Sequence, residues 1–245
     1  MPRGLASLWI VLTAAALHAQ EPVRVAFNCT EEDTREAGLT CSEDEPCPVY
    51  LELSGVESFL NRVFVVGNLH TSEATLFSIL LASEDNGKTW SEPFDRVRFA
   101  SLEQIQFIDF QKGYIGGALL QGVPRDPFFL ITEDAGATWR RQPVFDDSRF
   151  GVVEKFWFDS PNVGTLLIDT KQAHELYETH TGGDSWSLQQ SSRKAIQLPR
   201  QSHPADPPVR LRPDAKIHGY RVEKHEGAKW VALSDFLVDA GKCKN

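Results

Sequence analysis

The sequence predicts an all-β protein, a small β-propeller of about four blades, each a four-stranded antiparallel sheet. The first observation is a repeat of eight residues, Ser-x-Asp-x-Gly-x-Thr-Trp, which begins at Ser83 and Thr132 and, in weaker form, at Thr179 and Glu223. The starts are 49, 47 and 44 residues apart, and a period of this length indicates an array of small sheets. The second observation is a series of short β-rich runs separated by turn residues, with almost no helical periodicity.

The chain divides into a leader, a lead-in and the repeats. We expect a signal peptide over 1–20, an acidic lead-in over 21–47 and the propeller over 48–245. The expected blades run roughly over 48–96, 97–146, 147–190 and 191–240, and the fourth contains a Pro-rich, basic insertion from Arg193 to Pro208. This length accommodates one ring of four blades, and a half-ring completed by a second copy of the chain is the alternative.

The first twenty residues have the features of a cleavable export signal. Arg3 precedes an apolar run that includes Leu8 to Leu12 and is too short to cross a bilayer, which takes about 20 residues as a helix. No later segment approaches that length, so we expect a secreted or periplasmic protein without membrane insertion. The lead-in itself reads as a solvated loop stapled by disulfides, with one strand at Val23 to Phe27.

Four cysteines lie in the exported part, where disulfides persist, and they predict two disulfide bonds. Three pairings of Cys29, Cys41, Cys47 and Cys243 are open, and every one of them ties Cys243 to a cysteine near the N-terminus. A zinc site is the rival interpretation, but the spacing lacks the paired ligands of structural zinc sites. We expect no metal.

The formal net charge of -9 describes an acidic chain, and loss of the leader, with one arginine and no acidic residue, makes it about -10. Such a balance disfavours nucleic acid as a partner, because binding to phosphates requires a basic surface. It favours a soluble, self-repelling surface.

The repeated motif has a structural role. Gly suits the positive-φ position of a tight hairpin, Asp accepts hydrogen bonds from the backbone of the turn, and Trp supplies a large apolar surface at the start of the next strand. The expected structural positions are Ser83, Asp85, Gly87, Thr89, Trp90, Thr132, Asp134, Gly136, Thr138, Trp139, Thr179, Gly183, Ser185, Trp186, Gly227 and Trp230. Thr181 stands where the third copy needs Asp, and the fourth copy keeps only its Gly and Trp.

This motif resembles the Asp-box, or bacterial neuraminidase repeat, of sialidases, xyloglucan-active glycoside hydrolases, sortilin-type receptors and the propellers that assist photosystem II assembly. The stretch from Ile105 to Gly117 is similar to an inner-strand signature of the assembly-factor branch, and Phe156-Trp-Phe-Asp159 echoes it. The resemblance implies a propeller whose Asp-boxes lie in the turn between the third and fourth strands, away from the binding face, and are not catalytic.

Catalysis has weaker support in the sequence. Asp109 and Asp159 occupy equivalent turns of two repeats, so a structural role in the turn accounts for them better than acid–base catalysis. Four polar residues fall on the expected innermost strands and would line a central channel: Glu52, Glu154, Gln104 and Gln106. The two glutamates are the acid pair if the protein is a glycoside hydrolase. The Arg-Ile-Pro signature of sialidases is absent, and Tyr177 and Glu178 point to opposite faces of a strand. We expect no cofactor.

The remaining hypothesis is a binding face made by the loops at the end opposite the Asp-boxes, because loops on a rigid scaffold commonly carry recognition. The expected loops are 68–73, 121–126 and 169–174, with the connections between blades. The candidate binding residues are His70, Glu73, Arg125, Asp126, Arg149, His174, Arg193, Lys194 and Arg200. The predicted function is a protein-binding or assembly module, with another protein or an envelope complex as the partner; the alternative is a carbohydrate-binding or glycoside hydrolase (sialidase-like) role.

Overall fold

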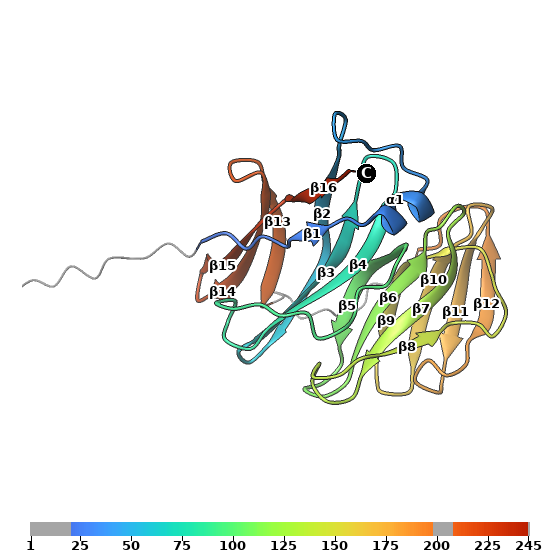
Figure 1. Ribbon diagram of the computed structural model, residues 1–245. Helices are drawn as coiled ribbons and strands as arrows, with labels where there is room; N and C mark the ends of the chain where they lie inside the picture. Colours follow the sequence, from blue (N-terminus) through green and yellow to red (C-terminus); the bar gives the residue numbers. More distant parts are fainter. Residues whose placement is uncertain (1–20, 198–207, 245) are drawn as a thin grey trace, which may run out of the picture.

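Sixteen strands and one short helix make up the parts of the chain that the computed structural model describes, residues 21–197 and 208–244. Figure 1 shows them in order along the chain. The elements are β1 (Phe27–Asn28), α1 (Glu31–Ala37), β2 (Cys47–Phe59), β3 (Arg62–His70), β4 (Thr75–Ser83), β5 (Ala100–Phe107), β6 (Gly113–Leu119), β7 (Arg125–Thr132), β8 (Arg140–Pro143), β9 (Val152–Phe158), β10 (Gly164–Asp169), β11 (His174–Thr179), β12 (Ser187–Ser192), β13 (Val209–Asp214), β14 (Gly219–Glu226), β15 (Lys229–Leu237) and β16 (Asp239–Cys243). The predicted all-β class is confirmed.

The strands form four sheets, consistent with the small propeller that the repeat predicts. The second sheet, β5-β6-β7-β8, and the third, β9-β10-β11-β12, are four-stranded antiparallel meanders. The first sheet has the order β1-β16-β2-β3-β4, and the fourth has three strands, β13-β14-β15. The fourth strand expected to start at Trp90 is reduced to two isolated bridges to β4, between Ala82 and Ser91 and between Phe77 and Arg98.

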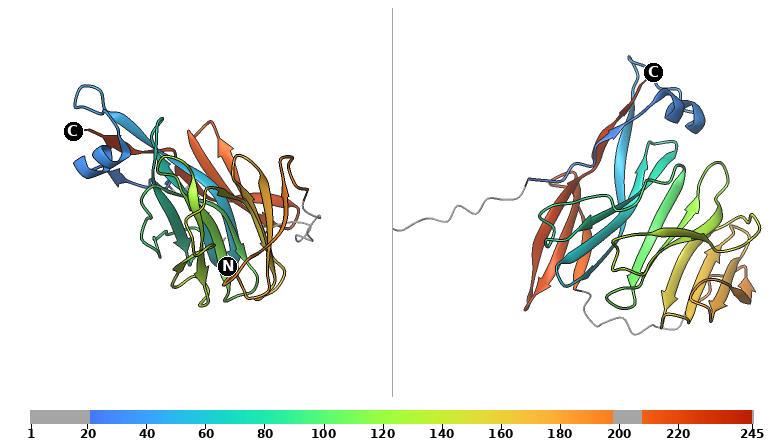
Figure 2. Two further views of the ribbon diagram at one scale, coloured as in Figure 1. Left: turned by 90° about the vertical axis from the view of Figure 1, so that its right-hand side faces the viewer. Right: turned by 60° about the horizontal axis from the view of Figure 1, so that its bottom comes forward.

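The sheets pack face to face in the order fourth, first, second, third. Strand β13 packs against β2, β5 against β2, β3 and β4, and β9 against β5, β6 and β7. In Figures 1 and 2 the sheet β13-β14-β15 lies at one end of this row and the sheet β9-β12 at the other. The last sheet of the chain therefore packs beside the first.

The first Asp-box shows why this sequence makes a tight turn. Asp85 accepts hydrogen bonds from the backbone N–H groups of Lys88 and Thr89 at 3.0 and 2.8 Å and from the Thr89 hydroxyl at 2.7 Å. The Ser83 hydroxyl accepts from the backbone N–H of Gly87 at 2.8 Å, and Gly87 adopts a φ of 84° that favours glycine. The bonds from Thr89 lower the pKa of Asp85 to about 2, so the ionised carboxylate is the form that accepts these hydrogen bonds.

The later copies of the Asp-box keep progressively fewer of these hydrogen bonds. The second box repeats the bonds of the first, with Asp134 bound to the Thr138 backbone and hydroxyl at 2.9 and 2.6 Å. In the third, the Thr181 hydroxyl takes the place of the carboxylate and accepts from the Ser185 N–H at 2.9 Å. The fourth is a two-residue hairpin around Gly227 and joins β14 to β15.

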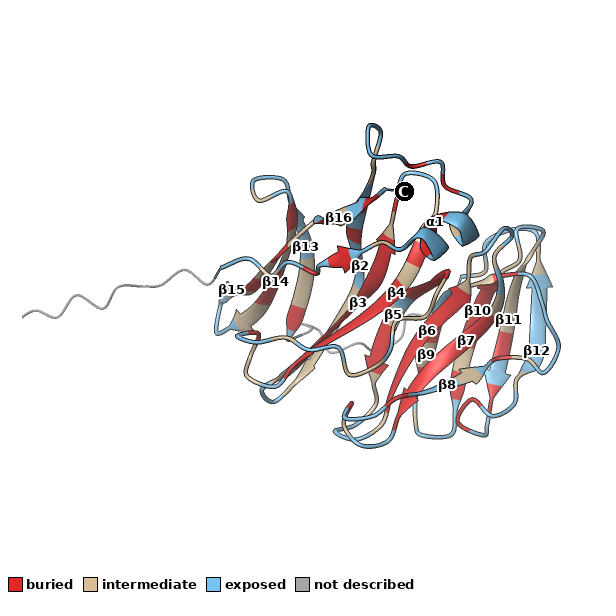
Figure 3. Cartoon of the chain, in the orientation of Figure 1, coloured by how far each residue is buried: buried red, intermediate tan, exposed pale blue. Residues whose placement is uncertain are grey.

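The motif tryptophans of the first three copies join neighbouring sheets. Trp90 meets Phe236 of the fourth sheet, Trp139 meets Phe64 of the first, and Trp186 stacks on Phe129 of the second. Figure 3 shows the resulting burial along the inner strands, whereas β12 is exposed. Each tryptophan thus fixes one sheet to the preceding one in the row, as the motif predicts.

The lead-in differs from the solvated loop that the sequence predicts, because it contains α1. Thr30 caps the helix: its hydroxyl accepts from the Asp33 N–H, and the Asp33 carboxylate accepts from the Thr30 N–H at 2.9 Å. Gly38 ends the helix in the left-handed region, with a φ of 67°. An isolated bridge joins Val23 to Phe236, so the lead-in also pairs with the fourth sheet.

Two disulfides hold this lead-in, as predicted. Cys29 pairs with Cys243, which ties the segment just before α1 to β16, and Cys41 pairs with Cys47. Strand β16 also hydrogen-bonds to β2 and to β1, so the C-terminal strand is part of the first sheet. Within the described residues, no helix is long and apolar enough to cross a membrane.

Candidate functional site

A cleft of about 520 Å³ lies between α1 and the loops of the first two sheets. One wall is the C-terminal half of α1, a second is the β3–β4 loop, and a third is the β6–β7 loop. The lining residues are Arg35, Glu36, Ala37, Gly38, Glu73, Ala74, Thr75, Phe99, Leu120, Gln121, Gly122 and Pro124. Two of the three loops expected to share a binding face, 68–73 and 121–126, therefore meet here, and Glu73 is among the predicted binding residues.

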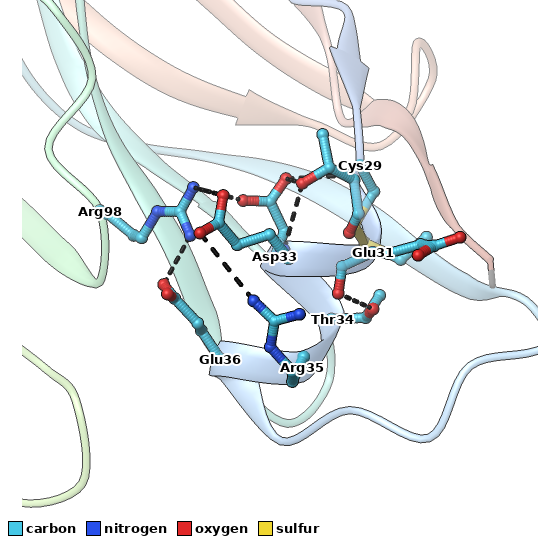
Figure 4. A network of polar contacts seen from close by, with 10 residues as sticks. Cys29, Glu31, Asp33, Thr34, Arg35, Glu36 and Arg98 are labelled. Atoms are coloured by element: carbon cyan, nitrogen blue, oxygen red, sulfur yellow. Dashed lines mark hydrogen bonds and ion pairs between the residues drawn. A yellow bond between two sulfur atoms is a disulfide. The ribbon is translucent and has the colours of Figure 1, made fainter.

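Arg98 fixes the helical wall (Figure 4). Its guanidinium donates to Glu36 at 2.6 Å and lies 3.1 Å from a carboxylate oxygen of Asp33 and 3.8 Å from Glu32. The same guanidinium stacks over the ring of Phe77 on β4, 5.4 Å from the ring centroid. The hydrogen bond to Glu36, with the nearby negative charges, raises the pKa of Arg98. One cation thus joins three carboxylates of the lead-in to the connection between the first two sheets.

Phe99 forms the floor of the cleft. Phe99 is buried and adopts a φ of 51°, which is uncommon for a residue with a bulky side chain. Its N–H donates to Leu76 in the first sheet at 2.8 Å, and its carbonyl accepts from Leu120 after β6 at 2.6 Å. These bonds hold the strained backbone and fix the two sheets to each other directly beneath the cleft.

The loop that carries Glu73 is also ordered by its own hydrogen bonds. The hydroxyl of Thr71 accepts from the N–H groups of Glu73 and Ala74 at 3.2 and 3.1 Å. His70, another predicted binding residue, ends β3 with Nδ1 2.9 Å from the Thr71 carbonyl and its ring 5.9 Å from Tyr50. The Glu73 carboxylate takes part in none of the ion pairs among the described residues.

A smaller hollow of about 260 Å³ is lined by one more of the predicted residues, and two others lie next to that residue. Asp126 lines it, together with Phe145, Asp146 and Asp147. The Asp126 carboxylate accepts from the Arg149 N–H at 3.0 Å and lies 3.7 Å from the Arg125 guanidinium, while Arg149 stacks over Phe145. The Asp126 carboxylate is therefore held by Arg125 and by the Arg149 backbone.

The two candidate acids of the hydrolase alternative lie on different sheets. Glu52 is on β2 and Glu154 on β9, with the sheet of β5 between them. Glu154 is 2.7 Å from Nδ1 of His174, another predicted binding residue. It also lines a hollow of about 540 Å³ with Glu103 and Gln104. The side-chain amides of Gln104 and Gln106 bond to the backbone of the neighbouring sheet at Phe156 and Phe158.

The basic insertion is described only in part. Arg193 and Lys194 follow β12 and are exposed. Arg200 lies outside the described residues. Among the residues that the structure does describe, no group of three or more His, Cys, Asp or Glu side chains is placed to hold a metal ion.

Sequence reasoning missed the helical wall and Phe99. The helix had a readable signal: Thr30-x-x-Asp33 is a capping-box pattern, acidic residues fill the first turn and Gly38 follows the last turn. Phe99 had none, because its strained backbone results from contacts with two different sheets.

Comparison with known proteins gives no family assignment. No protein-family model matches the sequence. A search of the curated proteins likewise finds no match.

Among solved structures, the fold is similar to two propeller-containing chains. A GH74 xyloglucanase from Xanthomonas campestris is 17% identical with a TM-score of 0.39, over 54% of this chain and 19% of that one. A structure described as YCF48 bound to D1 peptide is 17% identical with a TM-score of 0.43, over 78% of this chain and 54% of that one. The chain therefore spans about a fifth and about half of their lengths, and the similarity concerns the fold.

Proposed function

We propose that this chain is an exported, non-enzymatic Asp-box propeller that binds another protein and acts as a recognition or assembly module. The observation that carries the proposal is the cleft between α1 and the loops of two adjacent sheets. Its volume falls within the roughly 300–1,000 Å³ typical of ligand sites. Its walls are held by disulfides, by Arg98 and by the bonds of Phe99.

The Asp-boxes support the same division of roles. Their polar groups bond to one another within the turns, and their tryptophans pack between sheets. Such residues serve the scaffold, and recognition is left to the loops at the other end. The two disulfides favour export, because such bonds persist in oxidising compartments.

A photo-crosslinking amino acid at Gln121, which lines the cleft, tests the proposal in the native host. The matched control carries the same group at Gln189, which is exposed on β12. We expect a discrete crosslinked protein from position 121 that is missing from position 189. Equal crosslinking at both positions, or none at 121, would contradict the proposal. Turnover of xyloglucan or sialyl reporters that is lost in Glu52→Gln or Glu154→Gln would instead establish the hydrolase alternative.

A further inference from the structure

The chemistry of the cleft walls identifies the kind of segment that fits. We infer that the cleft takes an extended peptide segment that carries a Lys or Arg beside a small aliphatic side chain. This inference rests on the proposed function and adds the chemical class of the partner.

The apolar requirement comes from the floor. Phe99 lies at its base, and Ala37, Ala74, Leu120 and Pro124 surround it. Leu120 and Pro124 are half-buried and Phe99 is buried, so a guest side chain on this floor would be largely removed from water. The bonds that Phe99 makes to both sheets hold the backbone of the floor in place, and we expect a small aliphatic group rather than a large ring to fit it.

The basic requirement comes from the rim. Glu73 is exposed beside the cleft, and its carboxylate enters none of the ion pairs among the described residues. The helical wall adds negative charge, because the three carboxylates of Glu32, Asp33 and Glu36 face only two guanidinium groups, those of Arg98 and Arg35. The C-terminal turn of α1 also borders the cleft, and the negative end of the helix dipole favours a cation there.

Arg35 is the one basic residue in the lining, and it offers an internal test. Its side chain is 73% exposed, and its guanidinium lies 4.0 Å from Glu32 on the same helix. Its charge opposes a basic guest, so its removal should strengthen binding, whereas removal of Glu73 should weaken it. If the guest were acidic, both effects would have the opposite sign.

The experiment uses a library of random linear heptapeptides displayed on phage and selected on the full exported chain. Peptides that also bind the Glu73→Lys variant are removed. We expect the retained sequences to be enriched in Lys or Arg next to Ala, Val or Leu. One selected peptide is then synthesised, and its affinity is measured by fluorescence polarisation. The affinity should fall about three- to fivefold in Glu73→Gln, as for a partly exposed ion pair, and rise in Arg35→Gln.

Glu178→Gln is the matched control, because Glu178 is an exposed glutamate on β11 of the third sheet. It should leave the affinity unchanged. Enrichment of acidic peptides, an unchanged affinity in Glu73→Gln, or no wild-type-specific peptide would overturn the inference. So would self-association of the chain that Glu73→Lys abolishes, since the occupant would then be a second copy. Crosslinking from Gln121 would still report a partner in each case, which separates failure of this inference from failure of the proposed function.

Discussion

Gln106 acts toward Phe158 as a peptide group would in a neighbouring strand. Its side-chain amide donates to the Phe158 carbonyl at 2.8 Å and accepts from the Phe158 N–H at 2.9 Å, although the two residues belong to different sheets. Gln104 makes the same pair of bonds to Phe156 two residues earlier. The second and third sheets are thus joined by two side-chain amides as well as by apolar packing.

Replacing Gln106 by Leu should destabilise the fold by about 2–4 kcal/mol, because it leaves two buried backbone groups without partners. Gln104→Leu should cost less, since that site is only half-buried. Urea unfolding followed by tryptophan fluorescence measures both. Equal losses for the two variants would show that burial does not set the cost.

The third Asp-box can be repaired. Thr181→Asp should supply the carboxylate that Asp85 and Asp134 provide in the other copies, with the Ser185 N–H and hydroxyl as donors. We expect a gain of about 0.5–1.5 kcal/mol in the free energy of unfolding near pH 7. The gain should disappear below the carboxylate pKa, because the protonated form loses these bonds. Thr181→Asn, which has an acceptor but no charge, is the control, and an equal gain in it would contradict the role of charge.

The fold could be predicted from the sequence because each copy of the repeat acts within a short stretch of chain. The candidate site could not, because its parts come from distant stretches. Asp85, Gly87 and Thr89 bond to one another and to Ser83 within one turn, so their spacing alone predicts the turn. The cleft needs α1, Phe99 and two loops from different sheets, which only tertiary packing brings together. Glu73 was expected on a binding loop, but nothing in its neighbourhood indicated that a helix from the lead-in would face it.

Glu57 should make stability depend on pH. Burial raises the pKa of this carboxyl from 4.5 to about 7, so the folded protein favours the neutral form. Stability is then unaffected below about pH 4.5, falls as the pH rises through the window from 4.5 to 7, and stays reduced above it. Glu57→Gln should remove this loss and stabilise the protein at pH 8 by about 1–2 kcal/mol, after allowance for partial exposure. Unfolding midpoints at pH 5 and pH 8 test this, and a gain of the same size at both would contradict it.

Arg98→Ala should loosen the helical wall of the cleft. It leaves Asp33, which is 5% exposed, without its cation, and we expect a loss of about 1–2 kcal/mol because Arg98 itself is partly solvated. Arg35→Ala removes an exposed arginine from the same helix and should change stability by no more than about 0.5 kcal/mol. Hydrogen exchange should show faster exchange confined to the amides of α1 in Arg98→Ala. Uniform acceleration over all four sheets would indicate that Arg98 stabilises the whole fold instead.

The two disulfides should differ in their contribution to stability. Cys29 and Cys243 are 214 residues apart, and Cys41 and Cys47 are 6 apart. In the chain-entropy model the long loop contributes about 5 kcal/mol and the short one about 2 kcal/mol, since restriction of the unfolded chain grows with loop length. Unfolding of the double variants C29S/C243S and C41S/C47S measures the difference. The first should also weaken binding at the cleft, because it frees the segment just before α1 from β16. If C41S/C47S proved the more damaging, local order of the lead-in rather than chain entropy would dominate.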